Sequence, residues 1–147
     1  MHPFDPRIVL LAKHAQHVVL IHFPIALYIA GVFFDLLSRG KKQSALASAG
    51  YFNFTLAALS IVPVIATGLL AWQFALEGQR VKGVLLLHIL LASASSLLIA
   101  LTWWIHRQAR RSQDDFLPGY RWPVEALAVL LVSMTGHLGG FLSGVNS

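Results

Sequence analysis

Four long apolar stretches, separated by short polar connections, set the pattern of this sequence. They run over about 14–37, 50–75, 83–105 and 122–145. Each is close to the roughly 20 residues that an α-helix needs to cross the hydrocarbon core of a bilayer. The pattern therefore predicts an all-α protein, an integral membrane four-helix bundle in which each stretch forms one span.

The residues before the first span form a separate segment. Residues 1–13 lack the order of basic, apolar and small residues that marks a cleavable signal peptide, so the first span is predicted to be an uncleaved anchor. Asp5 and Pro6 are suited to the N-cap and first position of a helix. We therefore divide the chain into an N-terminal tail or interfacial helix at 1–13 and a four-span membrane domain at 14–147.

Composition supports the membrane assignment and excludes several kinds of chemistry. The chain has 147 residues, of which 56% are hydrophobic and 12% charged, whereas soluble domains have about 25% charged residues. The absence of cysteine excludes disulfides, thiolate metal sites, iron–sulfur clusters and covalently attached c-type haem. The net charge of +5 does not indicate nucleic acid binding, because the basic residues fall in short connections between apolar stretches.

The distribution of these basic residues predicts the orientation of the chain. Lys and Arg are most frequent in the connections after the first and third spans, which hold Arg39, Lys41, Lys42, Arg107, Arg110, Arg111 and Arg121. The positive-inside rule then places both connections in the cytoplasm and both termini outside it. We expect the membrane to be the bacterial inner membrane.

Two ionisable residues near these basic connections receive an ordinary structural interpretation. Asp35 precedes Arg39 by one helical turn, so the two are predicted to form an ion pair at the membrane surface. His106 lies beside arginines at the end of the third span and is predicted to be solvated.

Four other histidines lie inside the apolar stretches, where an ionisable side chain indicates a functional site. At about 1.5 Å per residue, His17 and His88 are expected roughly 5–8 Å from the outer boundary, and His22 and His137 roughly 12 Å from it. Because spans alternate in direction, all four belong to one leaflet. Neutral imidazole is the commonest metal ligand, and helix bundles build cofactor sites from inward-facing side chains. We therefore predict b-type haem, with histidine as the iron ligand.

The spacing of the histidines suggests how they are shared. His17 and His22 project about 140° apart on one helix, so they are not expected to bind one iron together. Their depths pair His22 with His137 and His17 with His88, which gives one or two haems. His14 is a spare residue in this scheme. Haem propionates need cationic partners at the aqueous rim, and the candidates on this side are Lys13, Arg80 and Lys82.

The predicted function is that of a membrane b-type cytochrome-like electron-transfer subunit, working beside redox partner subunits or cytochromes and a possible quinone pool. Two histidine ligands saturate the iron, which favours electron transfer over chemistry on a substrate, so enzyme activity of its own is left open. One alternative is a zinc- or copper-binding membrane protein that uses His22, His88 and His137. Another is a structural anchor subunit of a larger redox complex.

Several motifs resemble one bacterial membrane family. HFPIAL at His22–Leu27, TGLLAW at Thr67–Trp72, TGHLGG at Thr135–Gly140 and the lone His88 are together similar to the four-span family labelled domain of unknown function 2231. The family often has a proline after its first histidine, where this chain has Val18. The resemblance implies a four-helix membrane protein suspected of binding haem and of working beside cytochromes.

Overall fold

The computed structural model describes residues 15–74 and 76–143. These residues form five helices: α2 (Ala15–Leu20), α3 (His22–Ser38), α4 (Ala45–Phe74), α5 (Gly83–Arg111) and α6 (Arg121–Leu142). With α2 and α3 taken together, four helical segments are long and apolar enough to cross a membrane. The predicted all-α fold with four membrane-spanning segments is thus confirmed. The predicted tail or interfacial helix at 1–13 lies outside the described residues.

The first span is interrupted at one residue, Ile21, close to Pro24. Helix α2 ends at Leu20 and α3 begins at His22. Pro24 lies four residues after Leu20, and a proline ring clashes with the carbonyl four residues before it and donates no backbone hydrogen bond. The break separates His17 on α2 from His22 on α3. Pro63, by contrast, lies inside the continuous helix α4.

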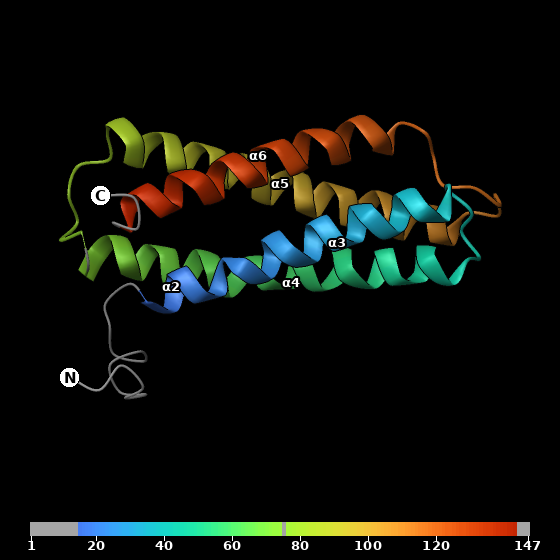
Figure 1. Ribbon diagram of the computed structural model, residues 1–147, viewed down its shortest axis with the longest axis horizontal. Helices are drawn as coiled ribbons and strands as arrows, with labels where there is room; N and C mark the ends of the chain where they lie inside the picture. The colour runs from blue at the N-terminus through green and yellow to red at the C-terminus, as the bar shows by residue number, and fades with distance from the viewer. Residues whose placement is uncertain (1–14, 75, 144–147) are drawn as a thin grey trace.

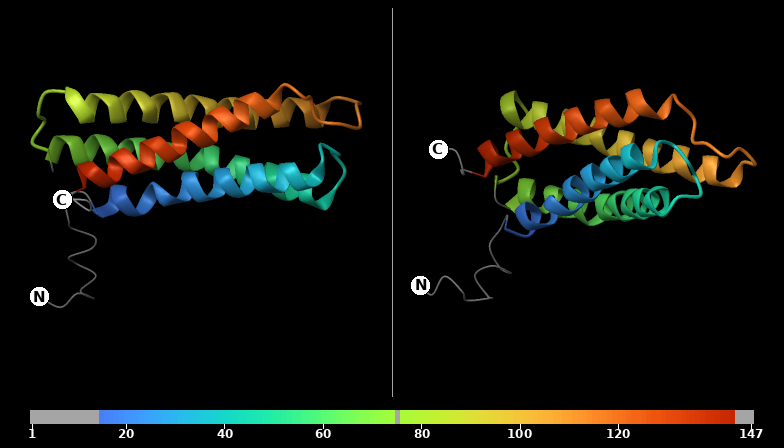
Figure 2. Two further views of the ribbon diagram at one scale, coloured as in Figure 1. Left: turned by 45° about the horizontal axis from the view of Figure 1, so that its top comes forward. Right: turned by 45° about the vertical axis from the view of Figure 1, so that its right-hand side comes forward.

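The helices form a bundle of two antiparallel pairs. Helix α3 packs mainly on α4 and α5 mainly on α6, with α4 and α5 joining the pairs (Figure 1). Figure 2 shows the same elongated arrangement from two further sides. We call one end of the bundle the α4–α5 end, because it holds that connection together with the start of α2 and the end of α6. The opposite end, which holds the α3–α4 and α5–α6 connections, is called the α5–α6 end.

Close helix approach in the first pair depends on small residues. A Cβ atom on Gly31 would lie 2.7 Å from the Phe54 ring, so α3 can meet α4 here only because residue 31 has no side chain. Phe54 in turn belongs to the buried core of the bundle, which also contains Tyr28, Ala57, Ile99, Ala128 and Val132. This core occupies the middle of the bundle and separates its two ends.

The outer surface of the bundle is apolar. Leu97 on α5 is 72% exposed and Val62 on α4 is 70% exposed. Monomeric soluble proteins rarely expose large contiguous apolar patches, since water penalises them. The surface is therefore suited to lipid, in agreement with the membrane assignment.

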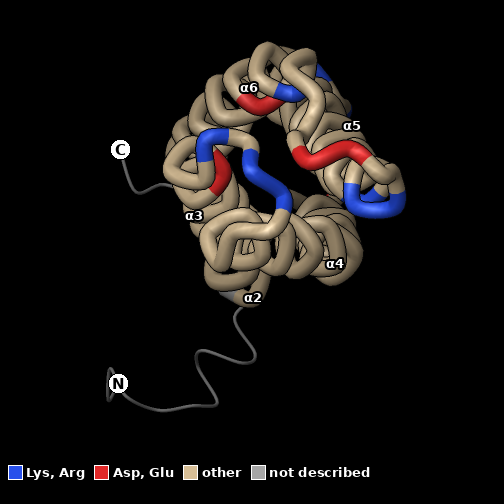
Figure 3. The backbone as a smooth tube through the Cα atoms, turned by 90° about the vertical axis from the view of Figure 1, so that its right-hand side faces the viewer, with Lys and Arg blue, Asp and Glu red and all other residues tan. Residues whose placement is uncertain are grey.

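Basic residues gather at the α5–α6 end, as Figure 3 shows. The structure corrects their expected placement, because α5 continues to Arg111 and includes Arg107 and Arg110, which were assigned to a loop. The guanidinium of Arg107 lies 5.2 Å from the centre of the Trp103 ring, and that of Arg110 lies 4.7 Å from the centre of the Tyr51 ring. Such cation–π contacts hold these two side chains of the last turns of α5 against aromatic rings.

One basic residue at this end is buried. Lys42 is 9% exposed, and its Nζ donates hydrogen bonds to the backbone carbonyls of Ala109 (2.7 Å) and Ser112 (3.1 Å) and to the Ser112 hydroxyl (2.9 Å). Carbonyls at a helix C-terminus lack intrahelical partners and carry partial negative charge. Lys42 therefore holds the α3–α4 connection against the end of α5.

Replacing Lys42 with methionine should destabilise the protein. The side chain keeps its length but loses three hydrogen bonds to Ala109 and Ser112, each of which contributes about 0.5–1.5 kcal/mol. Lys41→Met is the matched control, because Lys41 is exposed. Denaturation in detergent micelles measures both, and equal stability of the two variants would contradict the capping role of Lys42.

Candidate functional site

A large cavity opens at the α4–α5 end of the bundle. Its volume is about 470 Å³, which lies within the roughly 300–1,000 Å³ of ligand pockets in proteins. Residues of α2, α4, α5 and α6 line it, and most of the walls are apolar, with Ile21, Val64, Leu69 and Ile89 among the lining side chains. His17 and His88 also line this cavity. The structure thus brings together two of the predicted ligand histidines, from helices 50 or more residues apart.

His17 is held by a hydroxyl group on α4. Its Nδ1 lies 3.3 Å from the Thr67 Oγ1, while that hydroxyl donates to the Pro63 carbonyl at 2.8 Å. A hydroxyl has one proton, so we assign the remaining contact as His17 Nδ1–H donating to Thr67. The lone pair of the neutral ring is then on Nε2, which is one of the two ring nitrogens that can bind a metal. Gly68 makes room for the ring, since a Cβ there would lie 3.0 Å from the His17 Cε1.

His88 presents a polar atom that has no partner. Its Nδ1 is buried and makes no hydrogen bond, and the backbone of Thr135 lies beside the ring without completing one to that atom. A Cβ on Gly139 would lie 3.4 Å from the His88 Cε1, so α6 also provides space for this ring. An unsatisfied buried nitrogen is costly, and a bound ligand would remove that cost.

A smaller cavity of about 80 Å³ continues from the large one toward the core. It shares His17 and His88 with the large cavity and is also lined by Ser95 and Thr135. The hydroxyls of Ser95 and Thr135 are hydrogen-bonded at 3.1 Å. The two cavities together place the imidazoles at the inner part of one mostly apolar space.

The other two predicted ligands lie elsewhere. His22 is exposed on the outside of α3, where its Nδ1 donates to the Val18 carbonyl at 2.7 Å. His137 is exposed on α6, with its ring centre 5.0 Å from that of Phe141. The structure brings neither to a cavity, so it does not assemble the predicted His22–His137 pair. The trio of His22, His88 and His137 considered for zinc or copper is not assembled either.

The predicted propionate partners are only partly described. Arg80 and Lys82 are exposed in the connection between α4 and α5, at the same end of the bundle as the cavity. Lys13 and the spare His14 lie outside the described residues.

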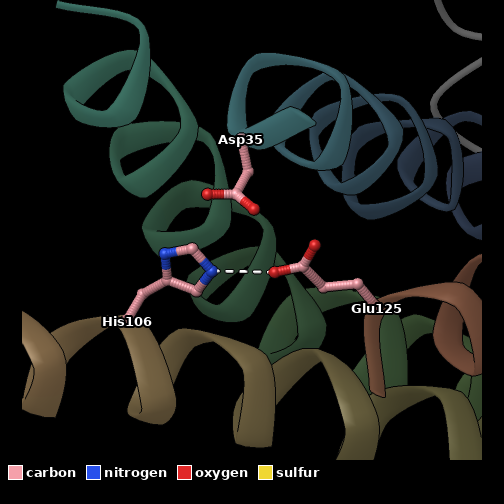
Figure 4. Close-up of side chains that lie close together, drawn as sticks. All are labelled: Asp35, His106 and Glu125. Atoms are coloured by element: carbon pink, nitrogen blue, oxygen red, sulfur yellow. Dashed lines mark hydrogen bonds and ion pairs between the residues drawn. The ribbon is translucent and has the colours of Figure 1, made fainter. Parts of the chain in front are cut away.

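A second group of polar side chains is buried near the α5–α6 end. Asp35 of α3, His106 of α5, Arg121 and Glu125 of α6 are each 1–2% exposed. Arg121 Nε donates to Asp35 Oδ2 at 2.7 Å, and His106 Nε2 lies 2.8 Å from Glu125 Oε1. One ligand atom from each of Asp35, His106 and Glu125 lies within 4.8 Å of the others, and Figure 4 shows the three side chains pointing toward one another. We call these four residues the buried charged cluster.

Aromatic and backbone groups surround this cluster. The Phe54 ring centre lies 4.6 Å from that of His106, and the guanidinium of Arg121 lies 3.9 Å from the centre of the Trp122 ring. Arg121 Nη1 also donates to the carbonyl of Pro118 at 3.0 Å. The cluster is therefore enclosed by protein within two turns of the helix ends, roughly 5–8 Å inside them.

Three expectations about these residues were wrong. Asp35 pairs with Arg121 and not with Arg39, which is the exposed residue that ends α3 in a left-handed conformation (φ 53°). Arg121 is the buried first residue of α6 and not a residue of the connection before it. His106 is buried against Glu125 and not solvated. Helix packing between distant segments outweighed the local spacing on which these predictions were based.

Glu125 was missed by the sequence analysis. The sequence does indicate this residue, because an acidic side chain inside an apolar span is costly and implies a partner in the bundle interior. The stretch WPVEALAVLL places this carboxyl within the predicted fourth span. Only the fold identifies its partner, which is His106.

Comparison with known proteins gives one match. The sequence model of a protein family described as a predicted membrane protein (DUF2231) matches residues 13–145. No curated protein and no solved structure matches the chain. The matched range includes the cavity and the buried charged cluster, and the family's description places such proteins in a membrane without naming a reaction.

Proposed function

The chain belongs to the DUF2231 family of predicted membrane proteins, and from this premise we propose that it is an electron-transfer subunit that holds b-type haem between His17 and His88. The observation that carries this proposal is that both imidazoles line one cavity of about 470 Å³ at the end of a membrane bundle. The proposal is for one haem, because His22 and His137 lie outside this cavity.

The residues present fit a haem in several respects. The walls are mostly apolar, which suits a large flat macrocycle, and no cysteine is needed. The contact with Thr67 leaves a lone pair on His17 Nε2, and His88 has a buried nitrogen without a partner. Gly68 and Gly139 allow the two rings to lie close to α4 and α6.

The ligand set determines the kind of activity that we propose. Haem supplies one-electron redox chemistry, and the protein controls it through the axial ligands, burial and access. Two histidine ligands leave no open position on the iron, so substrate chemistry is disfavoured. The role of His17 and His88 is to hold and orient the group, and the role of the apolar walls is to exclude water from it.

The surroundings of the cavity suggest which partners exchange electrons with the proposed haem. The cavity lies at the end opposite most of the basic residues, so by the positive-inside rule we propose that it is near the outer face of a bacterial inner membrane. Arg80 and Lys82 at this end are candidate partners for the propionates. We propose exchange of electrons between a quinone pool or membrane partner and a redox protein outside the cytoplasm.

Purified protein provides the first test. After expression with sufficient haem supply, the reduced-minus-oxidised visible spectrum should show a b-type haem, and extraction should give about one haem per chain. A colourless protein would contradict the proposal, and stoichiometric zinc or copper that is lost in His88→Ala would favour the histidine-based metal-binding alternative. A colourless protein without metal would favour a structural anchor subunit.

A larger side chain in the cavity should weaken haem binding without changing either proposed ligand. Ala92 lines both cavities, so Ala92→Phe should weaken haem binding by about 1–3 kcal/mol, the usual cost of overpacking, or roughly 5- to 150-fold. Ala100→Phe is the control, because Ala100 is exposed on the same helix. Haem titration measures both affinities, and an unchanged affinity in Ala92→Phe would place the haem elsewhere.

A further inference from the structure

The charges of the buried charged cluster do not balance. Asp35 and Glu125 are acids, Arg121 is a permanent cation, and a neutral His106 adds no charge, so one negative charge remains among groups that are each 1–2% exposed. A buried charge without compensation is strongly destabilising. The remaining charge can be compensated by a proton on one of the side chains of the cluster or by a bound cation.

The buried oxygens without hydrogen-bond partners favour a bound cation over a proton as the compensating charge. Asp35 Oδ1 and Glu125 Oε2 are buried and have no hydrogen-bond partner. A proton on His106 would strengthen its existing contact with Glu125 Oε1 but would give neither of these oxygens a partner. A cation seated between the two carboxyl groups would give both of them one.

The donor set also has the composition of a metal site. Three side chains from three helices each offer one ligand atom within 4.8 Å of the others, and all three are buried. Figure 4 shows that their carboxyl and imidazole groups converge on one point. Imidazole and carboxylate together suit Zn²⁺ and Mn²⁺ better than soft copper(I), which prefers sulfur.

We propose that Asp35, His106 and Glu125 form a binding site for a divalent first-row metal ion of the Zn²⁺ or Mn²⁺ class, at the end of the bundle opposite the haem cavity. The site is independent of the proposed haem, because it shares no residue with that cavity. Arg121 bonds to Asp35 through Oδ2 and leaves Oδ1 free for the metal. In this position Arg121 orients a ligand, as outer partners of metal sites commonly do.

Metal binding to the whole protein tests this proposal. Tag-free protein in detergent is treated with a chelator, incubated separately with Zn²⁺ and Mn²⁺, and freed of unbound ion before elemental analysis. We expect about one tightly bound ion per chain for at least one of the two metals. A folded protein that retains neither ion would overturn the proposal and leave a proton on one of the buried side chains as the compensation.

Conservative variants test which side chains bind the metal ion. Glu125→Gln and His106→Gln keep similar shapes and hydrogen-bonding ability, so they are suited to folding while removing one ligand each. Each should weaken binding of the retained metal by at least roughly tenfold, since even the loss of an outer partner costs 10- to 100-fold. Asp115→Asn and His137→Ala are the controls, because both residues are exposed.

The variants also distinguish this site from the histidines of the cavity. His88→Ala should leave the metal affinity unchanged, because His88 lies at the opposite end of the bundle. Equal binding to wild type, Glu125→Gln and His106→Gln would show that the ion binds elsewhere and would overturn the assignment. If His88→Ala loses haem but retains the metal ion, the haem site and the metal site are independent of each other.

Discussion

Haem is expected to be lost when His88 or His17 is replaced by alanine. Each substitution removes one of the two proposed haem ligands, and the expected fall in affinity is at least roughly tenfold, because even partners outside the ligand set contribute 10- to 100-fold. Nδ1 of His88 makes no hydrogen bond, so alanine breaks no hydrogen bond at that atom. The amplitude of the reduced-minus-oxidised spectrum per chain measures the loss.

The histidines outside the cavity provide matched controls for this experiment. His22→Ala and His137→Ala remove the same side chain from exposed positions on α3 and α6. Both should keep the wild-type haem content. If they lose haem while His17→Ala and His88→Ala retain it, the cavity is not the haem site and the His22–His137 pairing is favoured.

Replacing Arg121 with leucine should cause the largest loss of stability. Arg121 is 2% exposed and is paired with Asp35 through a hydrogen bond of 2.7 Å. Removing one partner of a buried ion pair leaves the other charge uncompensated, at a cost of about 3–5 kcal/mol. The same substitution removes the hydrogen bond from Arg121 to the Pro118 carbonyl and the contact with the Trp122 ring. Reversible denaturation in detergent micelles measures the free energy of unfolding.

Arg39 offers a direct comparison, because it is the partner that local spacing predicts for Asp35. Arg39→Leu changes an exposed residue at the end of α3 and should alter the stability by less than about 0.5 kcal/mol. The double variant Asp35→Asn with Arg121→Leu removes both charges and should recover part of the loss. Equal destabilisation by Arg39→Leu and Arg121→Leu would argue against the pairing in the structure.

The membrane fold could be predicted from hydropathy because lipid imposes a simple constraint. A span needs about 20 apolar residues with all backbone groups bonded internally, and this requirement is visible in the sequence. The exact ends of the helices were harder to predict from the sequence. Helix α5 continues to Arg111, with Arg107 and Arg110 lying over aromatic rings, and α4 begins at Ala45, earlier than the predicted second span.

The candidate ligands illustrate a limit of helix geometry. Spacing predicts that His17 and His22 project in different directions, and the structure places His17 at the cavity and His22 on the exposed surface. A count of depth gives the end of the bundle to which each histidine belongs, but it does not identify the inward face. That face depends on how α2 and α6 rotate against their neighbours.

The buried charged cluster shows a second limit. Asp35 and Arg121 are 86 positions apart in the chain, and the nearby Arg39 gave a plausible local partner at helical spacing. Glu125 and His106 come from different helices and meet only when α5 packs on α6. The charges inside the spans could be recognised from the sequence, but their pairing required the packed bundle.

Electron paramagnetic resonance of the oxidised wild-type protein at low temperature tests the central claim most directly, because axial ligands set the spin state of haem iron. Two imidazoles from His17 and His88 predict a low-spin ferric signal as the dominant species, and this signal should be absent in both His17→Ala and His88→Ala. A dominant high-spin signal in the wild type, or a low-spin signal that survives both substitutions, would contradict the account.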